Sequence, residues 1–139
     1  MNLNNMKLRS YLSGLLALVL IVVVGLTGCS TAPGGITGNY TEDTLHVVEN
    51  LLGAIDLPTD STNTDTVQTE IRSQINEYIA RYRRETKSGT LRSFTTMQTA
   101  LNALAGYYTS YGTRPIPDKL KSRLKVELNQ AKLAVERGN

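Results

Sequence analysis

Residues 91–111 read LRSFTTMQTALNALAGYYTSY, and this stretch decides the fold class. Its apolar side chains recur every three or four residues, which is the spacing that places them along one side of an α-helix. The stretch therefore predicts an amphipathic helix over 91–111 with one side turned toward a core. The side chains expected to face that core are Phe94, Met97, Leu101, Leu104, Ala105 and Tyr108.

Three further stretches show the same periodicity. They predict helices over 41–55, with Asn39 or Thr41 as the N-cap, over 66–86, and from Pro117 to about Gly138. We find no alternation typical of a strand, and four helices with short connections favour an up-and-down four-helix bundle of the all-α class. The other residues expected in the core are Leu45, Val48, Leu52, Ile55, Ile71, Ile75, Tyr78, Ile79, Tyr82, Leu120, Leu124, Leu128, Ala131 and Val135.

A short apolar run lies ahead of the first predicted helix. Lys7 and Arg9 precede an uncharged run over 12–26, and small residues then lead into Cys29. This order is typical of a lipoprotein signal peptide, which is cut before a cysteine that becomes acylated. The run is shorter than the roughly 20 apolar residues that a transmembrane helix needs. Cys29 is therefore the predicted lipid anchor.

The chain thus divides into a signal peptide over 1–28, a flexible tether over 29–38 and a four-helix bundle domain over 39–139. The tether is rich in Gly, Ser and Thr, a composition that we expect to bury no apolar area. Without Lys7 and Arg9 the chain keeps 13 basic residues against 12 acidic ones. This balance implies no strongly polyanionic partner, and export argues against nucleic acid.

Helical bundles often hold metals or haem, which need inward glutamates, several histidines or a methionine ligand. His46 is the single histidine and is expected at the surface. An acylated Cys29 cannot act as a nucleophile, and neither a serine elbow nor an inward carboxylate pair can be assembled. We therefore expect no enzyme activity, no cofactor and no metal site.

Arginine side chains supply the first candidates for protein binding. Arg81, Arg83 and Arg84 interleave with tyrosines near the end of the second helix. They form either a solvated face or, through Arg84 together with Arg92 and Arg114, a set of forked contacts to the carboxylates of a partner protein.

The third helix supplies the remaining candidates. No charged residue occurs from Ser93 to Thr113, and the side away from the core is small and neutral. Either this helix is the central one of a tight bundle, or it offers a flat docking face. Tyr107, Tyr111 and Arg114 follow at its end, and Tyr and Arg are enriched at interface hot spots. The predicted partner-binding residues are Arg84, Arg92, Tyr107, Tyr111 and Arg114.

Several segments of the chain resemble a known family. They are GITGNYTEDTL over 35–45, YRR over 82–84, LRSFTTMQTALNALAGYY over 91–108, Tyr111, and RPIPDKL over 114–120. In these segments the chain resembles the Psb27 family of photosystem II assembly and repair lipoproteins, in its cyanobacterial form. Tyr107 stands where the resemblance would lead us to expect histidine.

The resemblance implies a monomeric protein that is lipid-anchored on the lumenal side of the cellular thylakoid membrane. It implies transient binding to photosystem II core intermediates, chiefly through the large lumenal loop of an inner-antenna chlorophyll protein. It also implies that the bound factor keeps extrinsic subunits off until the manganese cluster can form. The alternative is a non-catalytic envelope lipoprotein that acts as a scaffold or small-molecule carrier.

Overall fold

The computed structural model describes residues 34–58 and 62–139, so the predicted signal peptide and Cys29 lie outside the described residues. The described residues form four α-helices and no strand. The predicted all-α four-helix fold is confirmed. The helices are α2 (Tyr40–Ile55), α3 (Thr64–Tyr82), α4 (Arg92–Tyr111) and α5 (Asp118–Glu136), with a short 3₁₀ helix, η1 (Ser88–Thr90), between α3 and α4.

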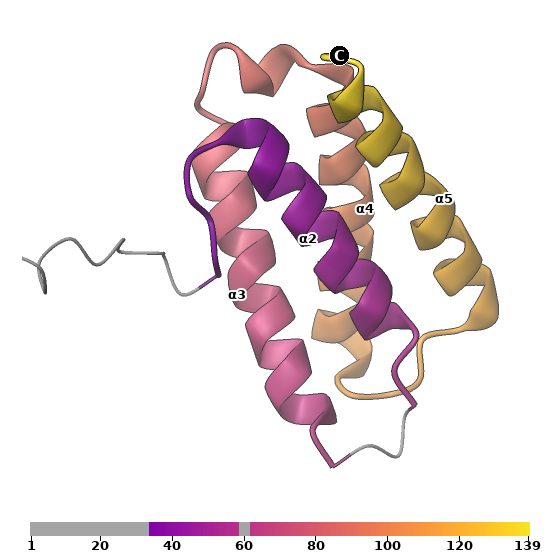
Figure 1. Ribbon diagram of the computed structural model, residues 1–139. Coiled ribbons are helices and arrows are strands. Elements are labelled where there is room, and N and C mark those ends of the chain that lie inside the picture. The colour runs from indigo at the N-terminus through magenta and orange to yellow at the C-terminus, as the bar shows by residue number, and fades with distance from the viewer. Residues whose placement is uncertain (1–33, 59–61) are drawn as a thin grey trace, which may run out of the picture. The chain divides into compact units, whose positions relative to one another are not determined.

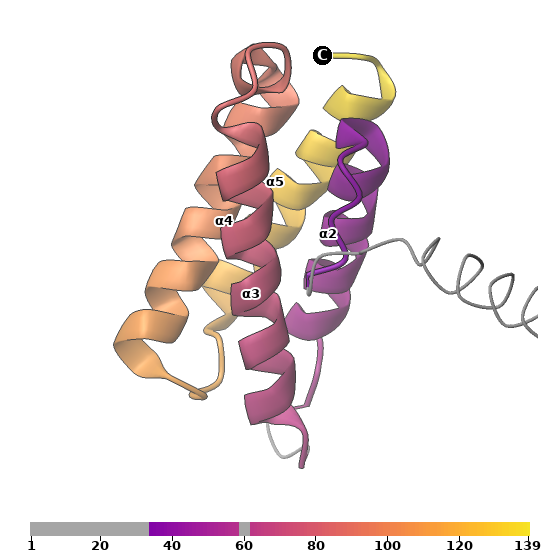
Figure 2. The ribbon, with the colours of Figure 1, turned by 90° about the vertical axis from the view of Figure 1, so that its left-hand side faces the viewer.

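The four helices run alternately up and down (Figure 1). Each packs against its neighbours in the chain, and α5 returns to pack against α2, so the helices close a ring around one core. Figure 2 shows the same arrangement from the side of α3. The Arg84 end of the bundle is where α3 ends and α4 begins, and the Tyr111 end is where α4 ends and α5 begins.

The core contains most of the predicted residues, but the stripe predicted for α2 is partly wrong. Val47 and Leu51 are fully buried, whereas Leu45 and Leu52 are only partly buried. Helix α2 packs against both α3 and α5, and its apolar residues cover a broad arc. Spacing alone therefore does not fix which side of that arc lies innermost.

Helix α3 ends at Tyr82, four residues earlier than predicted. The chain then turns into η1, where the backbone N–H of Gly89 donates to the carbonyl oxygen of Glu85 at 2.9 Å. The buried hydroxyl of Ser88 also donates to the Glu85 carboxylate at 2.5 Å. These bonds stabilise a tight turn in place of another helical turn. Arg84 therefore lies in the turn and not on the helix.

The segment over 34–38, here called the strap, is packed against α2 and α3. The backbone N–H of Gly34 donates to both carboxylate oxygens of Glu77, at 3.0 and 2.9 Å, and Gln74 Nε2 donates to the Gly34 carbonyl at 3.1 Å. Ile36 is only 8% exposed and belongs to the core. The prediction of a flexible tether that buries no apolar area is therefore wrong for 34–38, while 29–33 lie outside the described residues.

Asp43 anchors the other half of the strap. It lies in the first turn of α2, where its side chain is buried and accepts hydrogen bonds from the strap and from α3. The donors are Thr37 N (2.9 Å), Thr37 Oγ1 (2.8 Å), Gly38 N (2.9 Å) and the Tyr82 hydroxyl. Burial raises the pKa of Asp43, but these hydrogen bonds outweigh it and hold the pKa below the usual value of 3.8. The carboxylate therefore stays ionised inside the fold.

We expect Gly34→Ala to detach the first half of the strap. A Cβ at Gly34 would lie 2.9 Å from the Cα of Gln74 and 2.7 Å from Glu77 Oε2, so the strap must shift. The free energy of unfolding should fall by about 1 kcal/mol, and hydrogen exchange at the strap amides should accelerate. Gly53→Ala is the matched control, because nothing lies within 4 Å of its Cβ and alanine favours a helix. Unchanged exchange in Gly34→Ala would contradict the role of these contacts.

Candidate docking surfaces

The predicted contact residues lie at opposite ends of the bundle. Arg84 and Arg92 are exposed at the Arg84 end, and Tyr107, Tyr111 and Arg114 lie at the Tyr111 end. Helix α4 has 20 residues, which corresponds to a length of about 30 Å. The structure therefore brings the five residues together as two groups and not as one site.

The Tyr111 end presents an aromatic surface. The rings of Tyr107 and Tyr111 lie 4.9 Å apart, and the Tyr107 hydroxyl donates to the carbonyl oxygen of Pro115 at 2.7 Å. This bond fixes the loop after α4 against the ring of Tyr107. Tyr111 is 52% exposed, and Arg114 is also exposed. An exposed ring beside a cation is suited to protein contact.

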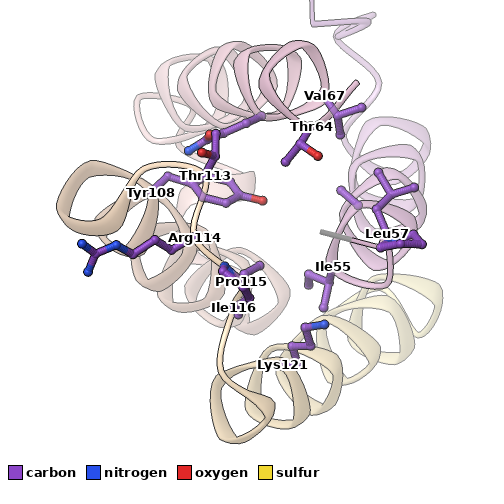
Figure 3. A pocket seen from close by; sticks show the side chains of 13 residues that line it. Ile55, Leu57, Thr64, Val67, Tyr108, Thr113, Arg114, Pro115, Ile116 and Lys121 are labelled. Carbon is purple, nitrogen blue, oxygen red and sulfur yellow. The ribbon is translucent and has the colours of Figure 1, made fainter. Parts of the chain in front are cut away.

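A mostly apolar pocket opens beside this surface, between the end of α2, the start of α3 and the loop that leads into α5. In Figure 3, Ile55, Tyr108 and Pro115 point toward the hollow, whereas the guanidinium of Arg114 extends away from it. Lys121 lies at the rim, so an apolar group in the pocket would have a cation beside it. The residues lining the pocket include Leu57, Val67, Gln68, Thr113 and Ile116.

Polar contacts hold one wall of this pocket. Gln68 Nε2 donates to the carbonyl oxygen of Gly112 at 3.1 Å and so ties α3 to the end of α4. The guanidinium carbon of Arg72 lies 5.9 Å from the centre of the Tyr108 ring. Burial raises the pKa of Tyr108, and the charge of Arg72 opposes that rise. The Tyr108 hydroxyl is therefore neutral at physiological pH.

The side of α4 that faces away from the core is only partly covered, since Thr96 and Ala103 are half-buried. Thr99, Gly106 and Ser110 are exposed, and within the described residues no atom comes within 4 Å of a Cβ placed on Gly106. Close packing by another helix of the bundle therefore does not explain the small residues here. The docking face on this side of α4 stays a prediction.

A cluster of two buried tyrosines, Tyr78 and Tyr82, and the partly buried Tyr40 supports the Arg84 end. The ring of Tyr82 lies 5.0 Å from that of Tyr40 and 5.1 Å from that of Tyr78. The Tyr40 hydroxyl is 2.7 Å from Ser93 Oγ, and the Tyr78 hydroxyl is 2.7 Å from Thr44 Oγ1. The cluster therefore links α2, α3 and α4. Sequence reasoning placed two of these rings in the core but missed the hydroxyl partners, which lie far away along the chain.

The hydroxyl groups of Tyr78 and Tyr82 are held in the protonated form. Burial raises the pKa of Tyr78 far above its usual value. Burial also raises the pKa of Tyr82, and the hydrogen bond to Asp43 raises it further. Both groups stay protonated at any physiological pH and act as fixed hydrogen-bonding groups.

Potential metal ligands are scattered in the described part of the chain. Across 34–58 and 62–139, no group of three or more His, Cys, Asp or Glu residues could hold a metal ion. His46 is exposed, and its Nε2 lies 3.2 Å from Nδ2 of Asn50 on the next turn of α2. The same residues include no helix that is both long and apolar enough to span a membrane.

The sequence of the chain is similar to those of known proteins. The sequence model of a family described as Photosystem II Pbs27 matches residues 9–135. The chain is 60% identical over 131 residues to Photosystem II lipoprotein Psb27 of Synechocystis sp., covering 94% of this chain and 97% of that protein. It is 49% identical over 121 residues to Photosystem II assembly factor lipoprotein Psb27 of Thermosynechococcus vestitus, covering 87% of this chain and 90% of that protein.

The fold of a solved relative agrees with this comparison. The solution structure of Psb27 from cyanobacterial photosystem II superposes with a TM-score of 0.74 at 59% sequence identity. The match covers 81% of this chain and 97% of that structure. The four helices described here are therefore the fold of these proteins.

Proposed function

This chain belongs to the Psb27 family of photosystem II proteins, in its cyanobacterial form, and we propose that it binds photosystem II intermediates as a lipid-anchored assembly and repair factor. The observation that carries the proposal is the 60% identity to the Synechocystis lipoprotein across nearly the full length of both chains. The same similarity to a photosystem II lipoprotein supports a location at the thylakoid membrane.

The finer proposal concerns the place and timing of binding. The protein is held by Cys29 on the lumenal side of the membrane and binds chiefly to the large lumenal loop of an inner-antenna chlorophyll protein. While bound, it keeps extrinsic subunits off until the manganese cluster can form. A signal peptide that ends at Cys29 supports export, and the resemblance to the family supports the choice of partner.

The bundle performs this role by binding and not by catalysis. The exposed groups at its two ends include the ring of Tyr111 and the guanidinium groups of Arg84, Arg92 and Arg114, which are suited to protein contact. The tyrosines inside are held protonated by burial. A small-molecule carrier would need an internal cavity, and the centre of the bundle is filled by Tyr78, Met97 and Leu101. The observations therefore favour the assembly factor over the carrier.

Co-purification tests the proposal. The tagged protein should be recovered from cyanobacterial membranes with photosystem II intermediates that lack extrinsic subunits, and should be missing from fully active complexes. Equal recovery with both fractions would contradict the assembly role. Cys29→Ser tests membrane attachment independently of partner binding. It should release the protein from membranes and leave its binding to detergent-solubilised intermediates intact.

A further inference from the structure

The turn between α3 and α4 concentrates positive charge. Residues 81–92 contain five basic residues and one acidic residue, although the whole chain has 15 basic against 12 acidic residues. All five basic side chains are exposed. Within the described residues, none of the five forms an ion pair. This group, here called the basic corner, consists of Arg81, Arg83, Arg84, Lys87 and Arg92.

The basic corner rests on a rigid base. Tyr82, between two of its arginines, is fully buried, and its hydroxyl donates a hydrogen bond to Asp43. The buried Ser88 closes the turn through Glu85, the single acidic residue of the segment. The backbone that carries the five cations is therefore held in place, which lowers the entropy lost when a partner binds.

A shallow hollow runs from the basic corner along the junction of α3 and α4. It is lined by Asn76, Ile79 and Ala80 of α3 and by Asn102 of α4, with Arg83 and Arg84 at one end. Figure 2 shows α3 and α4 side by side along this junction. Two amide side chains along a hollow can donate to and accept from a peptide backbone, and two guanidinium groups at its end can bind carboxylates.

We propose that the basic corner and the α3–α4 hollow together form a docking surface for a protein segment that carries at least two carboxylates. The carboxylates pair with Arg83 and Arg84, and the uncharged part of the segment lies over Asn76, Ile79 and Asn102. The assignment deepens the proposed function and rests on it. It also selects the Arg84 end of the bundle over the Tyr111 end as the main contact.

The alternative occupant of a basic surface is an anionic membrane. Surfaces that bind membranes combine cations with exposed large apolar side chains that insert between headgroups. The exposed large apolar residues of the described chain are Leu57, Tyr111, Val126 and Leu133, and none of them lies between 76 and 102. The chemistry of the hollow is polar and amide-lined, and so favours a protein segment.

Charge reversal of the two central arginines tests the docking surface. The full-length protein carrying Arg83→Glu and Arg84→Glu is compared with wild type for binding to a detergent-solubilised photosystem II intermediate that lacks extrinsic subunits. We expect the dissociation constant to rise by at least about tenfold. The neutral variant Arg83→Gln with Arg84→Gln should show a smaller loss, and the salt dependence of binding should weaken in both. Helical content and melting temperature should stay unchanged.

The matched control places the same charge change at the opposite end. Lys119→Glu with Arg123→Glu alters two exposed cations in the first two turns of α5, at the Tyr111 end, and should bind as wild type does. Loss of binding in this control, whether alone or together with the arginine variant, would overturn the selection of the Arg84 end. Equal binding by wild type and the arginine variant would overturn the docking surface. Absence of binding by wild type would overturn the proposed function itself.

A vesicle experiment distinguishes a protein segment from an anionic membrane as the partner of the basic corner. The same proteins are mixed with phosphatidylglycerol vesicles and with neutral phosphatidylcholine vesicles. Vesicle binding should not differ between wild type and the arginine variant. A loss confined to the anionic vesicles, with binding to the photosystem II intermediate preserved, would show that the basic corner contacts lipid and would overturn the proposal.

Discussion

We expect the Leu101→Ala protein to unfold with a free energy about 2–5 kcal/mol below that of wild type. Leu101 is fully buried on α4, which shares its most extensive interface with α5. Truncation removes its buried methyl groups and leaves a cavity that close-packed neighbours can fill only in part. A bundle of this size is stabilised by roughly 5–15 kcal/mol in total, so one residue removes a large share. Urea denaturation followed by circular dichroism measures the loss.

Leu133→Ala is the matched control, because it makes the same chemical change on the surface. Leu133 lies on α5 and is 50% exposed. Its replacement should change the free energy of unfolding by no more than about 0.5 kcal/mol. If the two variants were equally destabilised, the core at Leu101 would not have the packing described here.

The second large effect is expected at Asp43. In Asp43→Ala, the backbone N–H groups of Thr37 and Gly38 and the hydroxyl of Tyr82 lose their acceptor. The Tyr82 hydroxyl is buried and the two strap bonds are partly buried, so the loss of the acceptor is costly and the free energy of unfolding should fall by about 3 kcal/mol. Tyr82→Phe removes only one donor and should cost about 1 kcal/mol. Glu42→Ala removes the neighbouring exposed carboxylate and should cost less than either. A loss in Glu42→Ala as large as that in Asp43→Ala would contradict the special role of the buried group.

The same carboxylate gives stability a defined dependence on pH. Its pKa in the folded protein lies below the usual 3.8, so folding favours the ionised form. The stabilisation is therefore fully present above the unfolded pKa of about 4 and is lost as the pH falls through the lower folded pKa. The stability gap between wild type and Asp43→Asn should stay constant from about pH 7 to pH 5 and shrink below about pH 4. A gap that shrinks between pH 7 and pH 5 would show that another group controls the strap.

The helices were predictable because their signals are local. Apolar spacing indicated α4 to within one residue, and the predicted cap Asn39 does accept from the backbone N–H of Glu42, at 3.4 Å. The end of α3 was misplaced because the turn that stops it depends on the buried hydroxyl of Ser88. Nothing in the sequence marks that serine as buried.

The strap could not be predicted because its contacts are distant in the chain. Gly34 and Glu77 are 43 residues apart, and the composition around Gly34 is typical of a linker. The division of the predicted contact residues was, in contrast, implicit in the sequence. They were chosen by residue type, but the predicted alternation of helix directions already places Arg84 and Arg92 at one end and Tyr111 and Arg114 at the other.

The attachment of Gly34 to the flank of α3 has a mechanical consequence. Gln74 and Glu77 lie well inside α3, so the chain joins the bundle on its side, away from both ends. A pull on the chain at Gly34 would therefore load these hydrogen bonds before it reached the end of any helix. Because the attachment covers neither end of the bundle, both ends remain accessible to a partner.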